Sequence, residues 1–128
     1  SRPFTITFPS YPKERLFTFI NDNNEKIVCC GDEPYNENCY EYVKDASWLL
    51  HEAFCLYSQK DIYKPYQKHH STALDAGKLA SSLNAKHLVL WHTEEDNLSN
   101  RKELYTTEAK TVFNGKYYFG LKTPEYDF

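Results

Sequence analysis

The feature that most constrains the fold of this sequence is a set of short apolar runs. Each run is followed by a side chain that can bind a metal ion or a proton. Three such runs are followed by Asp32, by His51 and Glu52, and by His92. Short apolar runs bounded by turn residues are typical of buried β-strands. In α/β sheets, ligands bind in the loops beyond the carboxyl ends of the strands. The sequence therefore predicts a sheet whose strand ends carry a functional site.

The predicted elements come in the order of a layered α/β fold, with strands first and strand–helix–strand units after them. Asn21 to Asn24 is rich in turn residues, so the strands before and after it are expected to form a hairpin. Apolar runs and alternation predict strands over residues 4–8, 16–20, 26–30, 47–50, 86–90 and 116–119.

The clearest helix is predicted over residues 72–83. Thr72 and Asp75 have the spacing of a capping box at its start, and Asn84 is the predicted C-cap. Its buried face is predicted to hold Ala73, Ala76, Ala80 and Leu83, with Leu79 beside it.

The remaining segments give weaker signals. A short helix is predicted over residues 37–43, and residues 53–68, rich in tyrosine, are predicted to be mostly loop. A second longer helix is predicted over residues 100–112, with Leu104, Thr107, Ala109 and Val112 on its apolar face.

Composition indicates one folded domain over residues 1–128. Lys and Arg number 15 and Asp and Glu number 18, a formal net charge of −3, which argues against nucleic-acid binding through net charge alone. A small phosphate-bearing substrate stays open. Aromatic residues make up 16% of the chain, enough for a substantial core. The longest apolar runs are far too short to span a membrane, so no membrane partner is expected.

Cysteine and methionine bear on the compartment and on the boundaries of the chain. Cys29, Cys30, Cys39 and Cys55 follow no zinc-binding spacing, so free thiols in a reducing, cytoplasmic compartment are predicted. The chain begins Ser-Arg-Pro and contains no methionine. A beginning of this kind is typical of a chain that is processed, cleaved or part of a longer protein, and these alternatives stay open.

Four short elements contain the residues that could carry chemistry. They are Gly31-Asp32, His51-Glu52-Ala53-Phe54, His70-Ser71-Thr72 and Leu90-Trp91-His92. Carboxylate oxygens and imidazole nitrogens suit zinc, manganese or iron. Two such ions held a few ångströms apart can drive hydrolysis of a phosphoester.

In this order, the four elements resemble the C-terminal half of the metallo-β-lactamase fold, and are most similar to its ribonuclease Z-like branch. Gly31-Asp32 resembles that branch's Gly-Asp-Thr element, and His51-Glu52-Ala53 resembles its His-Glu-Ala-Thr element. His70-Ser71-Thr72 matches a His-Ser-Thr element, and the strand ending at His92 resembles the strand before the last metal-binding histidine. The resemblance covers about residues 26–118 and implies half of an αββα sandwich, a mixed sheet with helices packed on one face.

The resemblance also implies roles for these residues. Asp32 would bridge two divalent metal ions and His92 would bind one of them, with zinc expected before manganese or iron. His70 would face the scissile phosphate and assist the leaving oxygen, and Glu52 would pair with His70. His51 is a further catalytic candidate, ranked below Glu52. The implied activity is that of a metal-dependent hydrolase, a phosphodiesterase or ribonuclease Z-like enzyme, acting on a small phosphodiester or on RNA.

The sequence also departs from the family. The His-x-His-x-Asp-His motif that supplies most of the metal ligands is absent, and residues 1–25 match no element of the family. Phe54 stands where the family has Thr, and Glu33 follows Asp32 where Thr is usual. We therefore expect the N-terminal metal-binding half to lie outside this sequence, either on the same polypeptide or on a partner chain. A homodimer is a further alternative.

Each candidate also has a plainer explanation. Asp32 is consistent with a turn residue, His92 with an ordinary strand-end histidine, and His51 and Glu52 with a solvated strand end. If the chain is complete, a non-catalytic binding or interaction module, a degenerate or partial domain, is the alternative function.

Overall fold

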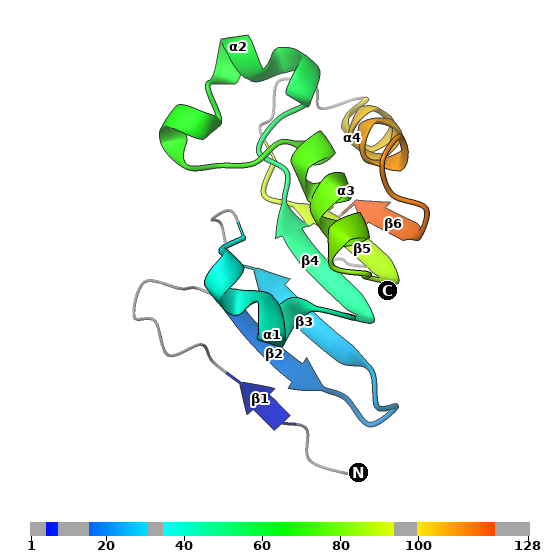
Figure 1. Cartoon of the computed structure of the whole chain (residues 1–128). Helices are drawn as coiled ribbons and strands as arrows, with labels where there is room; N and C mark the ends of the chain where they lie inside the picture. The colour runs from blue at the N-terminus through cyan, green and yellow to red at the C-terminus, as the bar shows by residue number, and fades with distance from the viewer. Residues whose placement is uncertain (1–4, 8–15, 31–34, 94–99, 120–128) are drawn as a thin grey trace.

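The computed structural model describes residues 5–7, 16–30, 35–93 and 100–119. Within these residues, the strands form one sheet in sequence order (Figure 1). The strands are β1 (Thr5–Thr7), β2 (Leu16–Ile20), β3 (Lys26–Cys30), β4 (Trp48–Glu52), β5 (His87–Trp91) and β6 (Lys116–Phe119).

The sheet is mixed. β1, β2 and β3 pair antiparallel, whereas β3, β4, β5 and β6 pair parallel to their neighbours. The predicted hairpin between β2 and β3 is confirmed, and the Asn21 side chain accepts hydrogen bonds from the backbone N–H groups of Asn23 and Glu25 in its turn. Because four neighbouring strands are parallel, their carboxyl ends lie at the same edge of the sheet.

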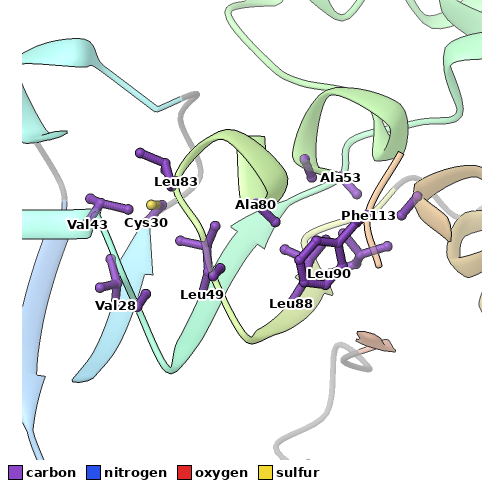
Figure 2. Close-up of a cluster of buried hydrophobic side chains, with 14 of the residues drawn as sticks. Val28, Cys30, Val43, Leu49, Ala53, Ala80, Leu83, Leu88, Leu90 and Phe113 are labelled. Carbon is purple, nitrogen blue, oxygen red and sulfur yellow. The ribbon is translucent and has the colours of Figure 1, made fainter. Parts of the chain in front are cut away.

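Three helices cover one face of this sheet (Figure 1), as the family resemblance predicts. They are α1 (Tyr40–Val43), α3 (Ala73–Ser82) and α4 (Arg101–Lys110). Figure 2 shows the core between the layers, where Leu49, Leu88 and Leu90 of the sheet meet Ala80 of α3 and Phe113. All five of these side chains are buried. The fold class predicted from the sequence is therefore confirmed.

The opposite face of the sheet has no helix of the described residues over it. Ile27, Trp48 and Leu50 are only half-buried there and line an open depression of about 480 Å³. The Trp48 ring stacks on His87, with ring centroids 4.1 Å apart. The two faces of the sheet thus differ sharply in how completely they are covered.

α3 confirms most of its prediction. The Thr72 hydroxyl accepts from the Asp75 backbone N–H at 3.1 Å, and the Asp75 carboxylate accepts from the Thr72 N–H at 3.0 Å, which completes the capping box. Asn84 is not the C-cap; Leu83 occupies that position. Asn84 instead follows in the left-handed conformation, with φ 57°, which asparagine tolerates better than most residues.

Two other predictions need correction. Residues 53–68 hold three short helical segments rather than mostly loop: η2 (Tyr57–Gln59), α2 (Lys60–Tyr63) and η3 (Tyr66–Lys68). Turns this short are too brief to show a helical period in the sequence. In α4, Leu104 and Thr107 are exposed, and the buried face holds Arg101, Tyr105 and Ala109. Ala109 is buried as predicted, but the rest of the buried face consists of Arg101 and Tyr105. A charged residue and a tyrosine do not produce an apolar period in the sequence.

The shorter elements agree closely with prediction. The helix expected over 37–43 is present as η1 (Glu37–Cys39) followed by α1. β4 extends two residues beyond the predicted 47–50, so that His51 and Glu52 lie in the strand itself. All four cysteines are free and buried. No helix in the described ranges has the length and apolar character needed to span a membrane.

Candidate active site at the carboxyl ends of the parallel strands

The Glu52 side chain makes three hydrogen bonds at this edge of the sheet. It is the last residue of β4 and is fully buried. Its Oε1 accepts from the Ser71 backbone N–H at 2.8 Å and from the Ser71 hydroxyl at 3.1 Å. Its Oε2 lies 2.6 Å from Nδ1 of His70. Glu52 thus joins the end of β4 to the residues that precede α3.

Backbone pairing holds these two segments side by side. The N–H of Phe54 donates to the Ser71 carbonyl at 2.8 Å, and the N–H of Ala73 donates to the Cys55 carbonyl at 3.0 Å. The Ala53 N–H donates to the Trp91 carbonyl at 2.9 Å, which ties the same segment to the end of β5. Main-chain hydrogen bonds therefore hold three segments together: the residues after β4, the residues before α3 and the end of β5. These bonds do not depend on which side chains the segments have.

His70 is positioned by stacking as well as by Glu52. Its ring lies nearly parallel to that of Phe54, with centroids 4.4 Å apart and an angle of 6° between the planes. Since Glu52 engages Nδ1, the other ring nitrogen, Nε2, is the atom left for a ligand or substrate. The Phe54 that departs from the family pattern therefore forms one wall of the His70 site.

His92 follows β5 and completes the group. Its backbone has a φ of 54°, the left-handed region, which costs a residue with a side chain free energy and occurs often at functional sites. Its ring centroid lies 5.7 Å from that of His70. The side chain is exposed, so it can be reached from outside the chain.

Glu52, His70 and His92 each offer one possible ligand atom, and these three atoms lie within 4.8 Å of one another. Imidazole nitrogen and carboxylate oxygen are the donors that zinc and similar divalent ions prefer. The donor set therefore suits a divalent metal. However, the 2.6 Å contact between Glu52 and His70 is a hydrogen-bond distance, which favours a proton between these two side chains and leaves His92 as the freest ligand.

Burial shifts the pKa values of Glu52 and His51. Burial raises the pKa of Glu52, while the hydrogen bond and charge of His70 and the hydrogen bonds from Ser71 act in the opposite direction. Burial lowers the pKa of His51, which favours its neutral imidazole. The Nδ1–H of His51 donates to the Glu52 carbonyl at 2.8 Å. His51 therefore lies next to the group and hydrogen-bonds to the backbone of Glu52 rather than to its carboxylate.

The structure brings together Glu52, His70 and His92, three of the five residues predicted from the sequence. His51 lies beside them, with its ring turned to the backbone of Glu52. Asp32, the predicted bridging ligand, lies outside the described residues. Sequence reasoning missed Ser71 as a partner of Glu52. The only signal for it was its place beside His70, since a serine there reads equally well as a helix cap.

Comparison with known proteins was made in sequence and in structure. No family model matches the chain. It is 34% identical over 120 residues to a Bacillus subtilis (strain 168) protein named "Probable metallo-hydrolase YhfI", a match that covers 89% of this chain and 45% of that protein. It is 37% identical over 68 residues to ribonuclease Z of Prochlorococcus marinus (strain MIT 9515), covering 53% of this chain and 21% of the relative. The chain thus spans at most about half the length of these relatives.

Solved structures agree on the fold. The crystal structure of the metallo-β-lactamase fold protein YhfI from Bacillus subtilis superposes with a TM-score of 0.73 at 26% identity, covering 92% of this chain and 47% of that one. Human tRNase Z, short form, superposes with a TM-score of 0.59 at 22% identity, covering 82% of this chain and 34% of that one, and supports the fold alone. These matches cover the C-terminal part of the relatives.

Proposed function

Since this chain has the fold and sequence relationship of the C-terminal part of metallo-β-lactamase fold proteins, we propose that it is the C-terminal half of a metal-dependent phosphodiesterase. The observation that carries the proposal is the hydrogen-bonded pair of Glu52 and His70 beside His92. A buried carboxyl paired with an imidazole near a metal-binding histidine is suited to proton transfer next to a metal centre.

His70 is the proposed general acid. Its Nδ1–H donates to Glu52, which orients the ring so that a proton on Nε2 can pass to the leaving oxygen of the phosphodiester. Ser71 holds the second oxygen of Glu52, so the carboxylate stays oriented while the proton moves. Stacking against Phe54 fixes the plane of the imidazole. Orientation of this kind contributes to catalysis because the donor does not need to reorganise during the reaction.

His92 and Asp32 are the proposed metal ligands of this chain, His92 from the end of β5 and Asp32 from the segment after β3. When bound, two divalent ions, zinc in our proposal, would activate water and stabilise charge on the phosphate. These two residues are too few for a dinuclear site. We propose that the remaining ligands come from the N-terminal half of the fold, on the same polypeptide or on a partner chain.

The substrate we propose is an RNA or small phosphodiester. The ribonuclease Z relatives favour RNA, whereas the formal charge of −3 gives this chain no large cationic surface field for a long nucleic acid. Four free, buried cysteines are consistent with a reducing compartment such as the cytoplasm.

Metal content of the complete, natively expressed protein is the first test. We expect nearly two divalent ions per chain by elemental analysis. Asp32→Ala and His92→Ala should each lower this content and abolish phosphodiester hydrolysis. His70→Ala should keep its metal and lower kcat by about 10²- to 10⁴-fold, because it removes only the proton donor.

His87→Gln is the matched control, since His87 lies in β5 but stacks on Trp48 at the opposite face of the sheet. It should keep both metal and activity. Full activity in Asp32→Ala would refute the ligand assignment. A complete protein without metal would instead indicate a non-catalytic interaction module.

A further inference from the structure

A cavity of about 340 Å³ is lined in part by His70. Its wall includes Tyr35, His51, Tyr66, His70, Asp75 and Leu79. We call it the His51 cavity. Its volume is at the lower end of the range for small-molecule sites, about 300–1,000 Å³. Nothing in the proposed reaction uses it, although it shares His70 with the proposed site.

His51 lines this cavity and has an unpaired nitrogen acceptor. The side chain is 1% exposed, and its Nδ1–H donates to the Glu52 carbonyl, which can only accept. The other nitrogen, Nε2, therefore carries a lone pair, and it has no hydrogen-bond partner within the described part of the chain. A buried acceptor without a partner costs about 1–3 kcal/mol, so a group that donates a hydrogen bond is favoured there.

Asp75, one of several further polar residues of the wall, also offers acceptors. The Asp75 carboxylate accepts from the Tyr66 hydroxyl at 2.8 Å and from the Thr72 N–H at 3.0 Å. A carboxylate offers only acceptors, with capacity for further donors. The aromatic rings of Tyr35 and Tyr66 also line the wall. The cavity thus combines acceptors with aromatic rings, which suits a flat heterocycle that carries an amine.

We propose that the His51 cavity binds a nucleobase with an exocyclic amine, with His51 Nε2 accepting a hydrogen bond from that amine. The choice of a nucleobase rests on the proposed function, because His70 lines the cavity and is also the residue that faces the phosphodiester. A base held there would belong to a nucleotide next to the scissile bond. His51 is then a specificity residue that reads the amine, and aromatic rings beside it supply stacking.

Binding of adenosine and of purine riboside to the complete protein, in the presence of a chelator, tests this proposal. The two nucleosides differ only in the amine, and neither carries a phosphate, so no metal or hydrolysis is required. We expect adenosine to bind about three- to tenfold more tightly, the effect of one net hydrogen bond. The imidazole ¹⁵N resonance of His51 Nε2 should shift when adenosine binds and stay in place with purine riboside.

Variants of His51 identify the acceptor. His51→Phe should abolish the preference for adenosine, and His51→Gln, which can still accept near the Nε2 position, should retain part of it. His87→Gln should leave both affinities unchanged. Equal affinities for the two nucleosides, or no binding of either, would overturn the proposal. Metal content and phosphodiester hydrolysis in the same protein report on the proposed function separately.

Discussion

At the scale of single residues, burial and partners give one residue type very different chemistry. His51 and His70 both lie next to Glu52, yet one donates to its backbone carbonyl and the other pairs with its carboxyl group. His51 is fully buried and its pKa is lowered by that burial, whereas His70 retains a partly open ring. His70 is therefore suited to exchange protons with a substrate, and His51 to accept a hydrogen bond as a neutral ring.

The cysteines give a test at the same scale. Burial raises the pKa of the Cys29 thiol to about 11 and raises that of Cys30 still further. Because only the thiolate reacts quickly, we expect no cysteine of this chain to be alkylated by iodoacetamide at neutral pH in the folded protein. Mass spectrometry should show labelling at Cys29, Cys30, Cys39 and Cys55 only after unfolding. Rapid labelling of any of them in the native state would contradict the burial described.

At the scale of elements, the candidate site lies at the N-terminal end of α3. The capping box between Thr72 and Asp75 fixes the first turn, and His70 and Ser71 lead directly into it. Thr72→Ala should lower the free energy of unfolding by about 1 kcal/mol, measured by urea denaturation of the complete protein. Thr72→Ser, which keeps the hydroxyl, should stay close to the parent. Equal losses in both variants would show that packing of the methyl group matters more than the cap.

The contact between α3 and α4 depends on a glycine. A Cβ added to Gly77 would lie 2.8 Å from the Ala109 carbonyl oxygen and 2.8 Å from Cγ2 of Val112. Alanine favours a helix over glycine by about 1 kcal/mol, but overpacking of this kind costs about 1–3 kcal/mol. Gly77→Ala should therefore destabilise the protein in thermal unfolding. Lys78→Ala, at the next and exposed position of the same helix, should not, and a stabilised Gly77→Ala would mean that the helices separate easily.

At the scale of the whole molecule, helices cover one face of the sheet and leave the other partly open (Figure 1). Ile27, Trp48 and Leu50 lie half-buried on that open face. We propose that the N-terminal half of the fold packs there, because the first relative is about twice as long as this chain, and the chain matches its C-terminal part. An N-terminal half packed on this face would account both for the open face of the sheet and for the small number of metal ligands in this chain.

Leu50→Glu tests that packing in the complete protein. A carboxylate at a covered position should lower the free energy of unfolding by about 2 kcal/mol or more, seen as a lower Tm. An unchanged Tm in the complete protein would show that this face stays open to solvent.

From the sequence alone we predicted the positions of the strands, the β2–β3 hairpin, the capping box of α3 and the fold family, but not the order of the strands in the sheet. These features depend on local chemistry, such as turn residues, side-chain caps and apolar periods, or on short motifs in a fixed order. The sequence also predicted the pairing of Glu52 with His70, but only through the family resemblance. It did not reveal the buried face of α4, because that face uses Tyr105 and Arg101 and carries no apolar stripe.

The arrangement of the candidate site residues depends on the tertiary structure and could not be read from the sequence. The distance between Glu52 and His70 depends on main-chain pairing of segments 18 residues apart, and that of His70 and His92 on the register of β4 and β5. The unpaired Nε2 of His51 is likewise a property of what surrounds it after folding. Long-range contacts of this kind produce no periodic pattern in the sequence, because the two partners lie far apart along the chain.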